Sequence, residues 1–294
     1  MIILDLSQVM LSNILAQLGN HTNAKVEESM VRHMVLNSIR SYRTKYGNTY
    51  GELVIACDNK NYWRRELFPY YKANRKKNIE KSEFDWKSIF ECLGKIRQEL
   101  KDFFPYRIIE IETAEADDII GSLCMKFGVT EDDWSFEQLD QKPILILSGD
   151  HDFIQLHKYT NVEQFDPVKK KKITHNNPKV YLKEHIIRGD VGDGIPNFLS
   201  PDNCLVLGQR QKPIMNKKLQ HWVKQQPEQF CTELQLRNYR RNEQLIDLSK
   251  IPENIYNMII ESYESQNNKK TKDLMSYFMN NNLKMLMESI NEFV

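Results

Sequence analysis

Residues 142–152 read KPILILSGDHD, an unbroken apolar run that is followed at once by a turn and by Asp150 and Asp152. A run of this kind, bounded by turn residues, is typical of a strand that is buried on both faces of a parallel sheet. Two other segments repeat the arrangement, since MIILD ends at Asp5 and LVIACD ends at Asp58. The alternation of such runs with helical patterns predicts an α/β fold, a mostly parallel central sheet with helices on both faces.

The remaining elements follow from the spacing of the apolar residues. Four runs are predicted strands: 2–6, 53–57, 107–111 and 143–148. A hairpin is expected between 162–165 and 173–174, with Lys169 to Lys172 as a solvated turn. Three stretches have helical periodicity: 26–43, 85–103 and 114–127. We expect Gly47 to stop the first helix, Ser82 and Asp85 to open the second as a capping box, and Thr113 to cap the third.

Carboxylates gather where the predicted strands end or helices begin. There are nine of them on five segments: Asp5, Asp58, Glu115, Asp117, Asp118, Asp150, Asp152, Asp190 and Asp193. Because the carboxyl ends of parallel strands share one edge of a sheet, we expect these side chains to converge in one crevice. Neighbouring carboxylates raise one another's pKa and cost stability unless cations compensate them. The sequence therefore predicts a site for hard divalent ions such as Mg²⁺ or Mn²⁺.

Each carboxylate taken alone has a simpler explanation, because Asp is a common helix cap and turn residue. Five separate clusters favour the metal site. Two divalent ions roughly 3.5 to 4 Å apart can activate a water and stabilise both oxygens of a phosphoryl displacement. Glu115 and Asp118 would share one face of a helix, while Asp117 would point elsewhere unless the motif lies across the helix start.

The composition is ordinary for a globular protein: 294 residues, of which 40% are hydrophobic and 28% charged. No apolar stretch approaches the roughly 20 residues that span a bilayer, and Met1 runs directly into a strand without a leader. The five cysteines are widely spaced, so neither a disulfide framework nor a zinc site is indicated. We expect a cytoplasmic protein that does not associate with membranes.

The formal net charge of +1 conceals two basic segments. Residues 60–81 hold eight basic side chains against two acidic ones, and residues 204–227 hold five and none. This pattern predicts that the two basic segments bind a polyanion and guide it across the metal site. Lys72 and Arg75 are spaced for one helical face. The aromatic residues suited to stacking on unpaired bases are Tyr62, Trp63, Tyr70 and Tyr71. With few apolar anchors of its own, the first segment is expected to be mobile.

Several motifs, in this order and spacing, resemble those of the flap endonuclease and 5′-to-3′ exonuclease family: DNKNYWRRE (58–66), YYKANR (70–75), EADD (115–118), SGDHDFIQL (148–156) and GDVGDGIP (189–196). The likeness is greatest to the ribonuclease H branch of T-even-type bacteriophages and covers nearly the whole chain. It implies a PIN-like nuclease domain in residues 1–185, with a basic helical arch at about 60–82. The strand pattern stops after Gly189, and residues 186–294 are expected to form a smaller helical DNA-binding domain.

The resemblance implies a nuclease that uses two Mg²⁺ ions, or Mn²⁺, to remove RNA primers and 5′ flaps during replication. It assigns ligands motif by motif. The first metal receives Asp5, Asp58, Glu115, Asp117, Asp118 and Asp150, and the second receives Asp152, Asp190 and Asp193. Lys72 and Arg75 match the arch motif that holds the scissile phosphate. The other nucleic-acid contacts expected in the arch are Arg64, Arg65, Tyr71, Lys76 and Lys77.

One segment departs from the family pattern. After GDVGDGIP the family commonly has a GxGxK turn that grips duplex phosphates, whereas this chain reads NFLSPDNCLVLGQRQK. We expect four other cations to take that role: Arg210, Lys212, Lys217 and Lys218. The implied partners are DNA and RNA–DNA hybrids with 5′ ends, forks or flaps, together with a phage single-stranded-DNA-binding protein. The enzyme is expected to be a monomer in the cytoplasm of a bacterial host.

Three alternatives compete with this interpretation. A small single-strand ribonuclease with a PIN-like core would share the metal site but would not need the basic arch or the second helical domain. A haloacid-dehalogenase-like phosphatase would need an acid at position 7, which is Ser7. A non-catalytic DNA-structure-binding replication factor would keep the basic segments and could lose the acids, yet all nine are present.

Overall fold

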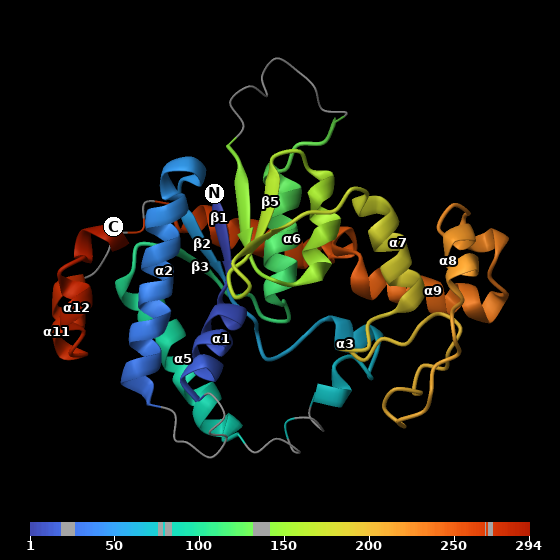
Figure 1. Cartoon of the computed structure of the whole chain (residues 1–294), viewed down its shortest axis with the longest axis horizontal. Coiled ribbons are helices and arrows are strands. Elements are labelled where there is room, and N and C mark those ends of the chain that lie inside the picture. Colours follow the sequence, from blue (N-terminus) through green and yellow to red (C-terminus); the bar gives the residue numbers. More distant parts are fainter. Residues whose placement is uncertain (19–26, 76–78, 80–83, 132–141, 268, 270–272) are drawn as a thin grey trace.

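The computed structural model describes residues 1–294 except 19–26, 76–78, 80–83, 132–141, 268 and 270–272. Its centre is a six-stranded sheet in the order β3-β2-β1-β4-β5-β6 (Figure 1). The strands are β1 (Ile2–Asp5), β2 (Leu53–Ala56), β3 (Arg107–Ile109), β4 (Ile144–Leu147), β5 (Val162–Asp166) and β6 (Lys171–Ile173). All neighbouring pairs are parallel except β5 and β6. The predicted fold class and all four predicted strands are confirmed.

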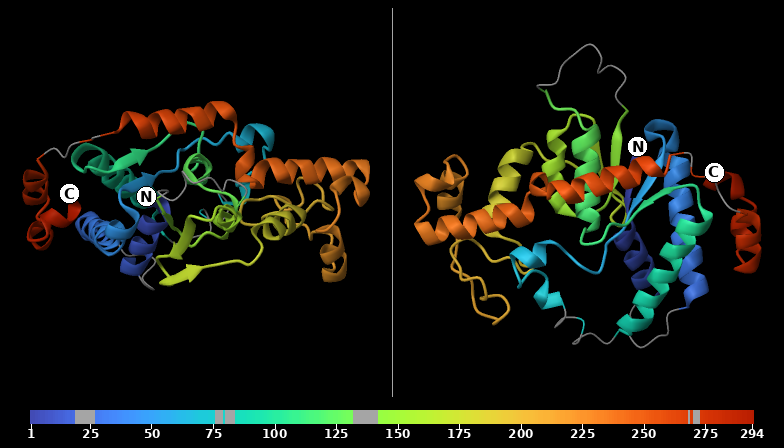
Figure 2. Two further views of the ribbon diagram at one scale, coloured as in Figure 1. Left: turned by 90° about the horizontal axis from the view of Figure 1, so that it is seen from above. Right: turned by 180° about the vertical axis from the view of Figure 1, so that it is seen from behind.

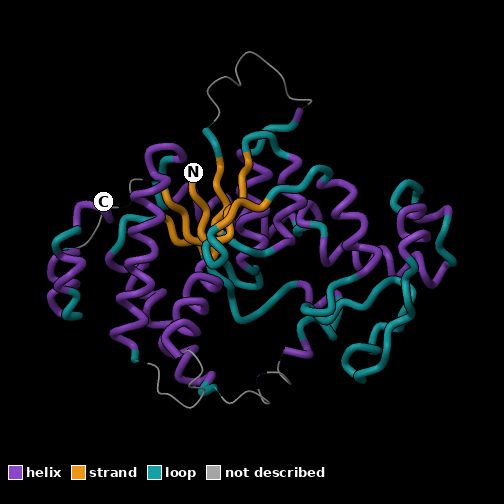
Figure 3. The backbone as a smooth tube through the Cα atoms, viewed as in Figure 1, coloured by secondary structure: helices purple, strands orange, loops and turns teal. Residues whose placement is uncertain are grey.

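The two faces of the sheet are buried separately, as the alternation of side chains along a strand requires. In β1, Ile2 and Leu4 join the apolar cluster formed with α1 (Leu6–Leu18), α2 (Glu28–Tyr50) and α5 (Trp86–Phe103). Ile3 faces the other way, into the cluster formed with α6 (Ala116–Phe127) and α10 (Glu253–Ser265). Figure 2 shows the molecule from behind, with α10 running across this second face. The strands therefore lie in a three-layer sandwich (Figure 3).

Several predicted element ends are wrong by a few residues. Helix α2 continues through Gly47 and ends at Gly51, whose φ of 86° stops the helix. Thr113 has a φ of 67° and does not cap a helix, because Glu115 is the N-cap of α6. Asp85 caps α5 by accepting a hydrogen bond from Ser88, while Ser82 lies outside the described residues. In the hairpin, the last two lysines of the predicted turn belong to β6.

A third apolar cluster lies beside the sheet, where α3 (Arg64–Leu67), α7 (Pro178–Arg188), α8 (Asn216–Trp222) and α9 (Glu233–Ile246) come together (Figure 1). Short 3₁₀ helices complete the chain: η3 (His151–Lys158), η4 (Pro227–Gln229), η5 (Leu248–Lys250) and η6 (Ile290–Phe293). None of the helices in the described part of the chain is both long and apolar enough to cross a bilayer.

The end of the chain returns to the α/β core. Leu248 and Ile255 pack on the α6 face of the sheet, while α11 (Leu274–Asn280), α12 (Lys284–Met287) and η6 cover α2 and α5. Phe278 and Phe293 are fully buried there against Phe104. The division into domains at residue 185 stays a prediction, and residues after 247 contribute to the core of the N-terminal part.

Candidate functional site

The carboxyl edge of the sheet brings together three of the predicted acids. Asp5 ends β1 with only 8% of its surface exposed, and its carboxylate accepts hydrogen bonds from the Gln8 amide (3.1 Å) and the Ser148 hydroxyl (3.1 Å). Burial raises the pKa of Asp5 to about 7, with smaller contributions in the same direction from the carboxylates of Asp58 and Asp150. The three strand ends thus place their acids within electrostatic range of one another, as the sequence predicted.

Backbone contacts hold the other two acids in place. The Asp58 carboxylate accepts a hydrogen bond from the Ala116 amide (2.8 Å), which ties the end of β2 to the start of α6. Asp150 is the N-cap of η3 and accepts the Asp152 amide (2.9 Å). The buried side-chain amide of Gln164 donates to the carbonyl of Asp150 (2.6 Å) and fixes the turn from the β5 side. Each acid is therefore positioned by its neighbours in the fold.

The EADD motif lies across the start of α6, and this reverses the roles expected for two of its acids. Asp118 is fully buried and reaches back to the Glu115 amide (2.9 Å), as in a capping box. Its carboxylate also accepts from the Trp63 indole (3.1 Å) and pairs with the Arg64 guanidinium (2.8 Å). Asp118 is thus occupied by contacts within the fold, and this structural role competes with its predicted role as a ligand of the first metal.

Asp117 faces the other acids. Burial raises its pKa well above the ordinary value, and the carboxylates of Asp150, Glu115 and Asp58 act in the same direction, while Lys72 opposes them. The condition that the sequence set for Asp117 is met, because α6 begins at Ala116 and the EADD motif lies across this start. Asp117 also lines a small cavity together with Asp152, Asp190 and Asp193, which links the two groups of predicted ligands.

The second group forms around the end of α7. Asp190 and Asp193 lie in one turn, in which the Asp193 amide donates to the Asp190 carboxylate (3.2 Å). Burial, together with the smaller effects of the carboxylates of Asp150, Asp190 and Asp193, raises the pKa of Asp152 to about 7, although His185 acts in the opposite direction. The three predicted residues of the second metal are therefore neighbours.

His185 completes this group and was missed in the sequence. Its Nδ1 lies 3.4 Å from Asp152 Oδ1, and its Nε2 lies 3.6 Å from Asp190 Oδ2. Burial opposes protonation of the imidazole, but its pairing with Asp190 and Asp152 outweighs burial and raises the pKa of His185. The same pairing lowers the pKa of Asp190 despite its burial. The available signal was the position of the histidine, five residues before the Asp190 of the GDVGDGIP motif.

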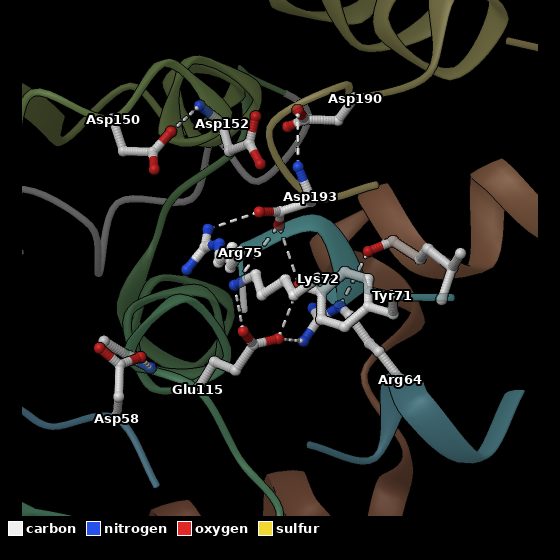
Figure 4. A network of polar contacts seen from close by, with 12 residues as sticks. Asp58, Arg64, Tyr71, Lys72, Arg75, Glu115, Asp150, Asp152, Asp190 and Asp193 are labelled. Atoms are coloured by element: carbon white, nitrogen blue, oxygen red, sulfur yellow. Dashed lines mark hydrogen bonds and ion pairs between the residues drawn. The ribbon is translucent and has the colours of Figure 1, made fainter. Parts of the chain in front are cut away.

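Two cations of the arch lie between the groups (Figure 4). The Lys72 ammonium donates to Glu115 and lies 3.4 Å from Asp193, while the Arg75 guanidinium is 2.5 Å from the other oxygen of Asp193. The Tyr71 hydroxyl lies within hydrogen-bond distance of two carboxylates, Glu115 (2.8 Å) and Asp193 (3.0 Å). The structure therefore brings Lys72 and Arg75 to the acidic centre, although Lys72 lies in a turn with a φ of 55° rather than on a continuous helical face.

Two predicted nucleic-acid contacts of the arch, Arg64 and Tyr71, are each only 2% exposed, and their contacts with nucleic acid stay predictions. Arg64 pairs with Glu115 (2.9 Å) and donates to the Leu245 carbonyl (2.8 Å), so it joins the arch to α6 and α9. Trp63 and Phe68 are also buried. These anchors contradict the expected scarcity of apolar contacts in this segment, as far as its described residues go.

The remaining predicted contacts are exposed or lie outside the described part. Arg65 is exposed, and its guanidinium lies 4.8 Å from the ring centre of Tyr62. Lys76 and Lys77 lie outside the described residues. The four cations proposed for the duplex, Arg210, Lys212, Lys217 and Lys218, are all exposed in and after the loop that precedes α8. Their contacts with nucleic acid stay predictions.

The donor set fits divalent cations. Its potential ligands are mostly carboxylate oxygens, which hard cations prefer, and burial penalises their charged forms. Lys72, Arg75, Arg64 and His185 neutralise only part of this charge. A cation site at the junction of the two groups would remove the remaining repulsion.

Comparisons with known proteins agree with this geometry. The family description "5′-3′ exonuclease, N-terminal resolvase-like domain" matches residues 1–185, and "T4 RNase H, C terminal" matches residues 176–293. The ribonuclease H of Enterobacteria phage T4 is 36% identical over 303 aligned positions, covering 99% of this chain and 95% of that protein. A phage T5 flap endonuclease solved with DNA and metal ions has a TM-score of 0.62 at 16% identity, covering 90% of this chain and 98% of that one. A T5 5′-exonuclease with bound zinc has a TM-score of 0.60, also at 16% identity, covering 90% and 99%.

Proposed function

Because this chain belongs to the 5′-3′ exonuclease family and is a structure-specific 5′ nuclease, we propose that it removes RNA primers and 5′ flaps in DNA replication. The observation that carries the proposal is the convergence of acids from five segments around Lys72 and Arg75. Two Mg²⁺ ions held there would supply activation of the attacking water and stabilisation of charge on the phosphate. The products would carry 5′-phosphates.

The ligands divide into two groups. Asp5, Asp58 and Asp150 hold the first ion, with Glu115 and Asp117 beside them, and Asp152, Asp190 and Asp193 hold the second. Asp118 has a different part, because its pairing with Arg64 fixes the start of α6 and with it the direction of Asp117. Mn²⁺ takes the same oxygen ligands and would substitute for Mg²⁺.

Lys72 and Arg75 are proposed to hold the scissile phosphate. Both cations reach Asp193, and Lys72 also reaches Glu115, so a phosphate between the two acid groups would meet both of them. The guanidinium can bind two phosphate oxygens at once, and the ammonium acts as a compact point charge. In this position the two side chains would stabilise charge that develops during the reaction.

Exposed cations are proposed to hold the rest of the substrate, which is DNA or an RNA–DNA hybrid with a 5′ end, fork or flap. They are Arg65, Lys76 and Lys77 in the arch, and Arg210, Lys212, Lys217 and Lys218 near α8. A phage single-stranded-DNA-binding protein is the proposed partner, and the enzyme is proposed to act as a monomer in the cytoplasm of a bacterial host. Because the similarity to phage T4 ribonuclease H covers both ends of the chain, the single-strand ribonuclease and the non-catalytic factor are not favoured.

The test is digestion of 5′-labelled flap, nicked and RNA–DNA substrates with and without Mg²⁺. We expect Mg²⁺-dependent release of 5′-phosphorylated products from all three. The same flap with a bulky folded protein attached to its 5′ end should be cleaved much more slowly, and a closed circular duplex without nicks should resist. Equal rates on blocked and open flaps would instead support a generic single-strand nuclease.

A further inference from the structure

His185 lies in the last turn of α7, where that helix packs against η3. The Gly189 amide donates to the His185 carbonyl (2.8 Å) and ends the helix, so the turn that carries Asp190 begins directly behind the histidine. The Tyr181 ring contacts the imidazole edge-on, with ring centres 6.0 Å apart. Only 17% of the side chain is exposed. The imidazole is therefore held in one place between the two carboxylates.

The distances around the imidazole differ from those of ordinary hydrogen bonds. Its nitrogens lie 3.4 Å from Asp152 Oδ1 and 3.6 Å from Asp190 Oδ2, which is longer than the usual limit of about 3.2 Å. One donor atom from each of the three residues lies within 4.8 Å of the other two. An imidazole binds an ion through one of its nitrogens, and two tetrahedral donors that are each about 2.1 Å from one ion lie about 3.4 Å apart. The 3.4 Å between His185 Nδ1 and Asp152 Oδ1 therefore suits two ligands that share a cation.

Resting on the proposed two-metal function, we propose that His185 supplies an imidazole nitrogen to the ion held by Asp152 and Asp190. A ligating histidine commonly has its second nitrogen held by a carboxylate, and both ring nitrogens of His185 face one here. Among the described residues, the histidine that lies within ligand range of two acids is His185, and its group contains Asp152 and Asp190 but none of Asp5, Asp58 and Asp150. The two metal sites therefore differ: the first has oxygen ligands only, and the second includes a nitrogen.

This difference has a chemical consequence. Imidazole favours later transition metals such as Co²⁺ and Zn²⁺ over Mg²⁺, while carboxylates favour Mg²⁺ and Mn²⁺. The second site should therefore bind Co²⁺ more tightly than the first site does. Replacing His185 by Gln should weaken Co²⁺ binding at one of the two sites by about 10- to 100-fold and change Mg²⁺ binding much less.

The experiment combines calorimetric titration with Co²⁺ and Mg²⁺ and pulsed electron paramagnetic resonance of the Mn²⁺-loaded protein. Wild type should show a nitrogen coupling to Mn²⁺, and His185→Gln should lack it. His151→Gln is the matched control, because His151 is exposed and stands between the two proposed ligands Asp150 and Asp152 in the sequence. This control variant should keep the coupling and both Co²⁺ affinities.

Labelling the histidines of wild type with ¹⁵N gives a second test that needs no variant. If the nitrogen that couples to Mn²⁺ belongs to a histidine, its signal in the pulsed resonance spectrum should change with the isotope. Two bound ions without nitrogen coupling in wild type would overturn the assignment of His185 and leave the two-metal nuclease intact. A coupling that persists in His185→Gln would overturn the assignment as well. Failure of the folded wild-type protein to bind any divalent ion would contradict the proposed function itself.

Discussion

Lys72 and Glu115 form an ion pair in which both side chains are almost completely buried, with 7% and 1% of their surfaces exposed. The same ammonium lies 3.4 Å from Asp193. Removing one partner from a buried pair leaves an uncompensated charge, which typically costs about 3 to 5 kcal/mol. Lys72 is thus part of the charge balance of the fold as well as the proposed phosphate contact.

Replacing Lys72 by Met should lower the melting temperature in the presence of a chelator by at least about 4 °C, because two buried acids lose their partner. Added Mg²⁺ should reduce this loss, since the ions compensate the same carboxylates. Single-turnover cleavage at saturating enzyme should be slower, as expected for a group that stabilises the transition state. The control is Lys60→Met, at an exposed position. An unchanged single-turnover rate would show that Lys72 is no more than a structural contact.

Asp150→Asn should remove at least about 3 kcal/mol of transition-state stabilisation, roughly a hundredfold in rate, because a ligand of the first ion is lost. Binding to a flap substrate should survive, since the change removes negative charge beside a polyanion. Single-turnover rates and a fluorescence binding assay measure the two effects separately. Asp102→Asn, on α5, serves as the control and should behave like wild type. Cleavage by Asp150→Asn at near the wild-type rate would contradict the metal assignment.

The two acids at the start of α6 should respond in opposite ways. Asp118→Asn weakens a buried ion pair with Arg64 and should lower the free energy of unfolding by about 2 to 4 kcal/mol. Asp117→Asn removes a buried carboxylate whose pKa is raised, so in a chelator it should leave stability unchanged or increase it while abolishing Mg²⁺-dependent cleavage. Urea unfolding measures the stability of both variants, and single-turnover cleavage measures their activity. If Asp117→Asn cleaves normally, the acid does not face the metal site.

Stability in a chelator should fall as the pH rises. Burial raises the pKa of both Asp5 and Asp152 to about 7 from the ordinary 3.8, so between these values the folded state holds protons that the unfolded chain has released. The free energy of unfolding must then decrease with increasing pH in that window. Mg²⁺ should reverse the trend, because it binds the ionised carboxylates. Melting curves of wild type and Asp5→Asn isolate the contribution of Asp5; identical pH slopes for the two proteins would contradict it.

The parts of this site that follow from local sequence were predictable. The apolar runs fixed the strands, and the parallel arrangement then placed Asp5, Asp58 and Asp150 at one edge. The roles of Asp117 and Asp118 were not predictable in the same way, because a shift of the helix start by two residues exchanges them. The spacing of apolar residues indicates roughly where a helix lies. The residue at which the helix starts decides which side chain faces the site, and the spacing does not define that residue.

Tertiary packing decided the rest. Arg64 and Tyr71 lie in a basic segment whose composition is typical of an exposed surface. Only their contacts with Glu115 in the folded protein show that they are buried. His185 becomes a neighbour of Asp152 because α7 packs on η3, which no periodicity in either segment reveals. Such contacts depend on how distant segments meet, and a single sequence gives no direct information on that.

The packing of Phe278 and Phe293 against Phe104 also has a consequence for synthesis of the protein. The ribosome makes these two residues long after the strands and the acidic motifs, so the core beneath α2 and α5 stays incomplete until residue 293 has been added. A chain released early, before residue 274, would expose apolar surface on that face and become a substrate for proteases. Coupling of the last helices to the core in this way would keep unfinished copies from accumulating as stable nucleases in the cell.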